Sequence, residues 1–213
     1  MRCRRESAPL RRYVLPVAAS VTLLASAAVA TYGGSQRDTI SSDALRADAT
    51  AVSGWVALGA QLDTEHGAEL LEAIEAGLRS RVVFEARLYR SRTGITRLLG
   101  DQLIAELQIT HVGFYDPLAD SYILDRSRRQ RGGDEAAGEP TPPSSYQDRE
   151  LFSQRLLSLH AELIGRLPDT TDDLYVALRV RLQPVDFVAP LHIISMFGGG
   201  ATASSWRNMP LDR

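Results

Sequence analysis

Lysine is absent from the 213 residues, and cysteine and asparagine occur once each, as Cys3 and Asn208. All 24 basic residues are therefore arginines. The sequence is also rich in alanine and glycine, so the use of arginine reflects GC-rich coding rather than function. Cys3 precedes the apolar run of the amino-terminal segment, so it is not an acylation site at the end of that run. Once that segment is removed, the protein has no disulfide, no thiolate nucleophile and no cysteine metal ligand.

Recognisable catalytic motifs are missing as well. The glycine run at 198–200 has no lysine beside it to contact a phosphate, so there is no Walker loop. Neither G-x-S-x-G nor H-E-x-x-H occurs. The four histidines lie in different predicted elements, at positions 66, 111, 160 and 192. The sequence therefore predicts no catalytic residues, no cofactor and no metal site.

The amino terminus has the three-part layout of a secretory signal peptide, residues 1–30. Five arginines and one acid precede an apolar run over residues 13–29. Ala28 and Ala30 form a small-x-small cleavage site before Thr31. We therefore expect export through a Sec-type pathway into the periplasm of a bacterium.

Two alternatives to a cleaved Sec leader stay open. An uncleaved apolar segment over residues 13–30 approaches the ~20 residues that span a bilayer, and it would anchor the protein in the inner membrane. Contact with a membrane is expected only in that case. Arg11 and Arg12 also resemble a twin-arginine export signal.

The chain without its leader suits one acidic domain. Removal of 30 of the 213 residues leaves 183, with 19 arginines and 25 acids, because five arginines and one glutamate leave with the leader. The remaining net charge of −6 excludes a general nucleic-acid binder, which would carry a basic surplus. We expect a flexible lead-in at 31–44, the domain at 45–207 and a tail at 208–213.

Hydrophobic periodicity predicts an α+β fold. A period of about 3.6 residues predicts two helices, Thr64–Ala76 and Asp148–Leu167, which end before Gly77 and Pro168. Alternation with a period of two predicts strands at 45–52, 55–62, 81–90, 103–110, 121–126 and 174–182. We expect a single antiparallel sheet of about six or seven strands, covered on one face by the two helices. The apolar run 191–197 fits a strand or a helix equally well.

Residues 127–147 break this periodicity with arginine, then acid, then proline and serine, which predicts a disordered, mobile loop. Its basic part would suit a contact with anionic lipid or nucleic acid. Acids within the same segment favour a solvated loop instead. The arginines concerned are Arg126, Arg128, Arg129 and Arg131.

Two histidines are polar exceptions in apolar patterns. His160 lies at helical spacing from Leu156 and Leu163, which predicts a hydrogen-bonded core residue. His111 lies where the strand pattern loses its phase, which predicts a bulge that re-aims a side chain near a site. Together with Asp116 it would be a candidate for hydrolysis. No nucleophile, base and orienting residue are recognisable together, so the enzyme hypothesis is the weakest.

Arginines also gather on the polar side of two predicted strands, at Arg81, Arg87, Arg179 and Arg181. If the strands are neighbours, these side chains form a positive stripe that binds carboxylate or phosphate through paired donors. The alternative is a solvated face on which the arginines pair with Glu85 and Glu106, and it is the more ordinary outcome.

Four further features follow one another in a characteristic order. A helix ends at Gly77 before the strand that contains Phe84, and a late Ser205-Trp206 pair closes the domain. Between them come an aromatic pair and a proline–leucine step, at Tyr115, Tyr122, Pro190 and Leu191.

Over about residues 45–207 this order resembles a bacterial exported family of unknown function, numbered 4390 among such families. The chain departs from the family by its insertion at 127–147 and its glycine run. The resemblance implies export, an α+β domain and a signalling partner in the envelope, and it supplies no catalytic residue.

The leading hypothesis is a non-catalytic cell-envelope protein that binds a partner protein or a small apolar or anionic ligand. One alternative is a periplasmic carrier of lipid or another small molecule, with a cavity between the helices and the sheet. The other alternative is a hydrolase that depends on His111. Binding is favoured because the polar sheet face offers charged groups, whereas no catalytic constellation is recognisable.

Overall fold

A computed structural model of the protein describes residues 39–92, 94–132, 141–168, 173–183 and 202–211. The predicted leader, with Ala28, Ala30 and Thr31, lies outside the described residues, as does the apolar run 191–197. Among the described residues, no helix is both long enough and apolar enough to cross a membrane.

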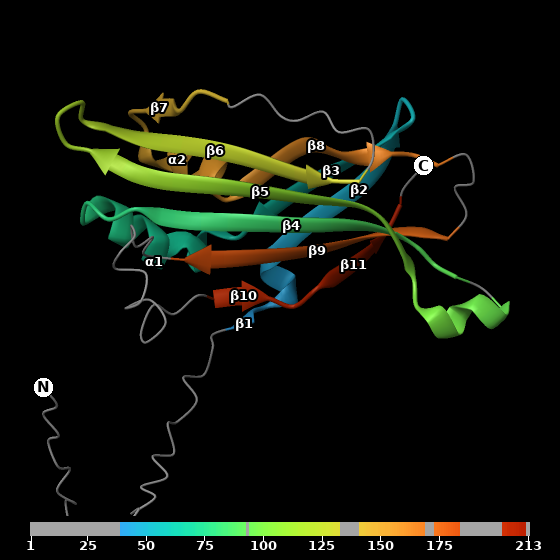
Figure 1. Cartoon of the computed structure of the whole chain (residues 1–213). Helices are drawn as coiled ribbons and strands as arrows, with labels where there is room; N and C mark the ends of the chain where they lie inside the picture. The colour runs from blue at the N-terminus through green and yellow to red at the C-terminus, as the bar shows by residue number, and fades with distance from the viewer. Residues whose placement is uncertain (1–38, 93, 133–140, 169–172, 184–201, 212–213) are drawn as a thin grey trace, which may run out of the picture. The chain divides into compact units, whose positions relative to one another are not determined.

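A large sheet forms one layer of the fold (Figure 1). Its strands follow the order β1-β10-β9-β4-β5-β6-β7, and β11 also pairs with β9. The pairs are antiparallel except for the short parallel pair of β1 with β10. The bounds are β1 (Thr39–Ile40), β4 (Ser80–Arg90), β5 (Gln102–Asp116), β6 (Ser121–Arg131), β7 (Ser144–Tyr146), β9 (Leu174–Gln183), β10 (Thr202–Ser204) and β11 (Arg207–Pro210).

A second, smaller sheet and two helices lie behind the large sheet in Figure 1. The small sheet has the order β2-β3-β8 and is antiparallel throughout. Its strands are β2 (Leu45–Val52), β3 (Trp55–Leu62) and β8 (Ser158–Arg166). The helices are α1 (Thr64–Glu75) and α2 (Arg149–Leu156), with the short 3-10 helices η1 (Ser42–Ala44) and η2 (Gly94–Leu99).

Local sequence signals explain the first elements. Ser53 and Gly54 both have positive φ, at 50° and 80°, which is the backbone of a tight two-residue hairpin turn between β2 and β3. Asp63 caps α1 by accepting a hydrogen bond from the backbone N–H of Glu65 at 3.4 Å. Gly77 ends the helix with φ 81°. The predicted strands 45–52 and 55–62, the first helix and the strand after it are confirmed.

The core lies between the large sheet and the layer formed by the small sheet and the helices. β4 and β9 bury alternate residues toward that layer, among them Phe84, Leu88 and Leu178. A Cβ on Gly113 of β5 would lie 2.8 Å from Phe152 of α2 and 3.0 Å from Ile74 of α1. A larger residue at position 113 would therefore displace these side chains where the two helices approach the sheet.

The prediction of a single sheet covered by helices was wrong in one respect, because the first hairpin forms a separate sheet. β2 and β3 pair with β8, and this second sheet covers part of the large one. Gly165 of β8 shows how closely the two sheets pack, since a Cβ there would lie 2.9 Å from Cβ of Ala105 on β5.

The predicted helix Asp148–Leu167 ends at Leu156, and residues 158–166 form β8 instead. Pairing with β3 outweighs local helix preference, because the free edge of β3 gains backbone hydrogen bonds along most of its length. The pairing has two register shifts, and Ala161 has φ 49°. Because of these irregularities Leu159 and Ile164 are buried whereas Leu163 is exposed. The resulting spacing of apolar residues in the sequence resembles that of a helix.

The predicted mobile loop at 127–147 is also partly regular. Residues 127–131 continue β6 in full register with β5, and residues 144–146 form β7, whereas 133–140 lie outside the described residues. The segments predicted as lead-in and tail likewise contain β1, η1 and β11.

Side chains of the large sheet donate hydrogen bonds to backbone carbonyls at the outer edges of the small sheet. Arg128 Nη2 donates to the carbonyl of Leu163 at 2.7 Å, and Gln130 Nε2 donates to that of Ile164 at 2.9 Å. At the opposite edge, Arg207 donates to the carbonyl of Leu45 on β2. The two sheets are thus joined by polar contacts on both sides of the apolar core.

We expect Gln130→Met to lower the free energy of unfolding by about 1–2 kcal/mol, because it leaves the partly buried Ile164 carbonyl without its donor. Gln108→Met is the matched control, since the side chain of Gln108 has no hydrogen-bond partner among the described residues. Urea denaturation of both variants measures the difference. Equal losses would contradict a role for Gln130 at the sheet edge.

Candidate functional site

The structure brings the four arginines of the predicted stripe onto one face of adjacent strands, the face turned away from the core. In the register of β4 with β9, Arg181 lies opposite Val83 and Arg179 opposite Glu85. The register of β6 with β5 adds two more arginines to the same face. We call this surface the arginine face, formed by Arg81, Arg87, Arg129, Arg131, Arg179 and Arg181.

Ion pairs neutralise only part of this surface. Arg87 Nε lies 2.9 Å from Glu106 Oε1, and this hydrogen bond raises the pKa of Arg87. Arg181 pairs with Glu85. Among the described residues, no carboxylate pairs with three of the other cations, Arg129, Arg131 and Arg179.

The arginine face carries a net positive charge within an acidic protein. Its six arginines share the face of β4, β5, β6 and β9 with four carboxylates, at Glu85, Glu106, Asp116 and Asp125. The whole chain has a formal net charge of −2. The positive charge is therefore concentrated on one surface, where it can attract a negatively charged partner.

Aromatic side chains lie among these arginines. The Trp206 ring centroid is 4.6 Å from Cζ of Arg87 and 6.0 Å from Cζ of Arg179, so the indole bridges two strands by cation–π contacts. Tyr89 and Tyr175 stack with centroids 5.4 Å apart. Burial and a hydrogen bond to Asp101 raise the pKa of Tyr175 to about 12, which keeps its hydroxyl protonated.

His111 lies on the opposite face of β5, in the core. The side chain is only 3 % exposed, and Nδ1 donates to the carbonyl of Leu156 at 2.9 Å. Burial lowers the pKa of His111 from 6.5 to about 4, so the imidazole is neutral. The ring packs edge-on against Phe84 at 5.4 Å. These contacts give His111 a structural role at the junction of β5 with α2.

The structure does not support the proposed pair of His111 with Asp116. The two residues point to opposite faces of β5, and Asp116 Oδ1 accepts hydrogen bonds from the backbone N–H groups of Leu118 and Ala119. The predicted bulge at His111 was wrong as well. β5 keeps its register there, and its irregularity lies at Ile104.

His111 lines a cavity of about 330 Å³ between β6, β7, α2 and β8, which sequence reasoning missed. An ion pair of Arg126 with Glu162 lies at its wall. His160 also lines the cavity, but it is exposed rather than buried as predicted, and it shares a 3.1 Å hydrogen bond with Ser158. The mixed polar lining suits a small polar molecule better than a lipid.

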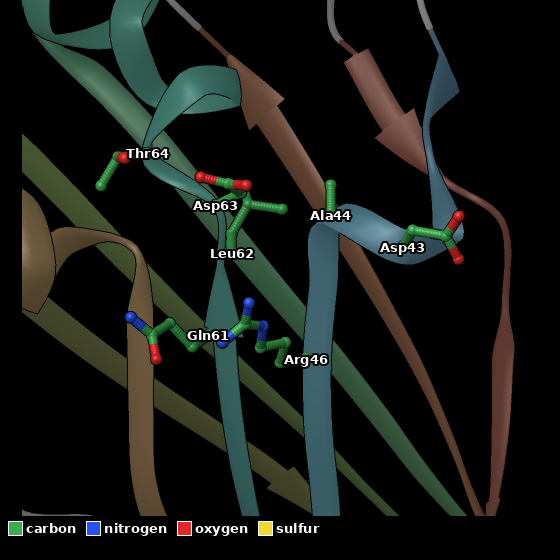
Figure 2. A pocket seen from close by; sticks show the side chains of 7 residues that line it. All are labelled: Asp43, Ala44, Arg46, Gln61, Leu62, Asp63 and Thr64. Atoms are coloured by element: carbon green, nitrogen blue, oxygen red, sulfur yellow. The ribbon is translucent and has the colours of Figure 1, made fainter.

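A smaller cavity of about 160 Å³ lies where β3 leads into α1 (Figure 2). Asp43 and Asp63 come from different elements and point apart, and Asp63 is already used to cap α1. Within the described ranges, no group of three histidine, cysteine or acidic side chains could hold a metal ion. This cavity therefore offers weaker binding chemistry than the arginine face.

The model of the family DUF4390, a domain of unknown function, matches residues 39–209. The chain belongs to the DUF4390 family. Comparisons with curated proteins and with solved structures found no match. Membership of DUF4390 covers nearly all the described elements, including the arginine face and the residues around His111, but assigns a role to neither.

The pKa of His111 predicts an acid-sensitive fold. Because the folded-state pKa is depressed, the contribution of the neutral imidazole is complete above about pH 6.5 and is lost as the pH falls toward 4. Between about pH 7 and about pH 4.5 this loss is about 2–3 kcal/mol. His111→Asn keeps a donor for Leu156 but removes the titration, so we expect denaturation curves that depend less on pH.

The matched control is His160→Asn, at the exposed histidine of the same cavity wall. Denaturation of both variants at the two pH values separates the two histidines. A His111→Asn protein that loses as much stability in acid as the unmodified protein would rule out the buried imidazole as the cause.

Proposed function

We propose that this DUF4390 protein is an exported, non-catalytic binding protein of the bacterial cell envelope. Its arginine face binds an acidic partner protein. The observation that carries this proposal is the placement of Trp206 between Arg87 and Arg179 on a face that also holds uncompensated arginines. Arginine, tryptophan and tyrosine are the residues that most often dominate the energetics of protein interfaces.

The geometry of the arginine face supports a flat protein partner. Neighbouring strands hold the guanidinium groups in fixed rows, and cation–π contacts restrain two of them before binding. Restraint of this kind lowers the entropy lost on association. Planar guanidinium groups bind carboxylates through paired hydrogen bonds, so acidic side chains are the complementary chemistry.

Export through the predicted leader is the second part of the proposal. The basic start, the apolar run and the site at Ala28 and Ala30 support cleavage before Thr31. N-terminal sequencing of the protein from an envelope fraction tests it. A chain that still starts at Met1 in the membrane pellet would support the anchored form instead.

A small-molecule carrier is the second candidate, and the cavity beside His111 is the observation that favours it. Gly113, Phe152 and Ile74 fill the space between the helices and the sheet where the sequence suggested a cavity. The ligand would therefore be small and polar rather than a lipid. Native mass spectrometry of protein purified from its own periplasm would detect such a molecule as a fixed mass increment.

We expect Arg129→Gln combined with Arg131→Gln to weaken binding of the acidic partner by roughly tenfold, because both cations are exposed and have no carboxylate partner among the described residues. Stability should change by no more than about 0.5 kcal/mol. The measurement is affinity capture from envelope extract at low and high salt, since screening weakens exposed charge pairs beyond ~8 Å at physiological salt.

Arg46→Gln combined with Arg155→Gln is the matched control, since it removes two exposed arginines that lie off the arginine face. Quenching of Trp206 fluorescence by the captured partner, in a Trp55→Phe background, would place that partner on the arginine face. Equal capture by the two double variants would overturn the proposed site.

A further inference from the structure

The connection between β4 and β5 presents leucines to solvent. Leu98 is 90 % exposed and Leu99 is 75 % exposed, at the end of η2. Leu103, at the start of β5, is also exposed. We call this connection, with its leucines and Arg97, the β4–β5 tip. In Figure 1 it projects beyond the ends of both strands.

A single exposed leucine is ordinary, but this cluster is not. Leu118, in the turn at the opposite end of β5, is 97 % exposed and stands alone between proline, alanine and aspartate. At the β4–β5 tip, two largely solvent-exposed leucines are adjacent in sequence and a third exposed leucine follows four residues later. Contiguous exposed apolar side chains mark a surface that contacts a protein or a membrane.

The charges at the tip indicate which of these it contacts. Arg92 and Arg97 flank the leucines, whereas Asp101 already accepts hydrogen bonds from the Tyr175 hydroxyl at 2.6 Å and from the Arg92 backbone N–H at 3.3 Å. With two arginines and one aspartate, the tip is apolar with a net positive rim. Leucines that insert below lipid headgroups, with arginines at the level of the phosphates, have this arrangement.

The tip is continuous with the aromatic part of the arginine face. Leu103 lies opposite Tyr89 in the register of β4 with β5, and Tyr89 stacks on Tyr175. Tyrosine has an apolar ring and a polar hydroxyl, a combination that suits the interface between lipid and water. The apolar tip, the tyrosines and the arginines thus follow one another along one side of the molecule.

We propose that the β4–β5 tip is a membrane contact, in which Leu98 and Leu99 insert into the interface of a bilayer that contains anionic lipid. The sequence alone placed membrane contact in the leader and, as a less favoured alternative, at the arginines around residues 126–131, and this contact is independent of both. A second copy of the chain is a poorer occupant. Three leucines present at most a few hundred Å², whereas a stable interface buries roughly 800 Å² on each partner.

The test places an environment-sensitive fluorophore at the tip of the full chain. Cys3→Ser removes the natural thiol, and Leu98→Cys or Leu118→Cys then carries the label at the tip or at the matched exposed leucine of the opposite end. The probes are vesicles of equal parts phosphatidylglycerol and phosphatidylcholine, with pure phosphatidylcholine vesicles for comparison. A quencher attached to the lipid chains reports insertion.

We expect the label at 98 to shift to shorter wavelength and to be quenched several-fold more than the label at 118, with less response on neutral vesicles and in high salt. Leu99→Ser should weaken the partition of the tip by roughly tenfold. Arg97→Gln should reduce the preference for anionic lipid.

Equal quenching at 98 and 118 would mean that the leader alone adsorbs the chain, and it would overturn the proposal. A spectral shift that grows with protein concentration in the absence of vesicles would assign the tip to a second copy instead. The acidic partner of the arginine face is measured separately, without lipid, so failure of one proposal does not decide the other.

Discussion

The small sheet depends on hydrogen-bond donors that its own strands do not supply. Its outer edges run along β2 and β8, and in both places a side chain of the large sheet donates to an edge carbonyl. A buried carbonyl without a donor costs about 1–3 kcal/mol, and an open edge invites pairing with another chain. The donors reach across because arginine and glutamine are long and planar at the end. They are Arg128, Gln130 and Arg207.

One strand divides its charges between structure and surface. Successive residues of β6 point to opposite faces, so Arg126 and Arg128 contact β8 while Arg129 and Arg131 join the arginine face. A run that looks like a uniform charged loop in the sequence is thus two separate rows. Composition alone cannot show this. The arginines alternate between the two faces only because residues 127–131 pair with β5 as a strand.

The sequence predicted those elements whose signals are local. The strands 45–52 and 55–62, the stop at Gly77 and the alternation of β9 each depend on neighbours within a few residues, and each matches the structure. The sequence placed Trp206 at the close of the domain but did not predict its contacts with Arg87 and Arg179.

The elements that sequence reasoning missed depend on distant partners. β8 is a strand because it pairs with the open edge of β3, although the local pattern around Leu156 and Leu159 is helical. The cavity beside His111 is formed by four elements from separate parts of the chain, and no spacing in the sequence reports it. Gly165 was the one available signal, since a glycine within an apolar run often marks a close approach of two backbones.

The contact of Arg207 with Leu45 joins residues 162 positions apart. The outer edge of β2, although this strand is near the start of the domain, therefore gains this donor only when β11 is available. Contacts of such long sequence separation slow folding, because the entropy of closing the loop is lost before the contact forms. The amino-terminal hairpin of β2 and β3 therefore cannot gain this edge contact before residue 207 has been synthesised.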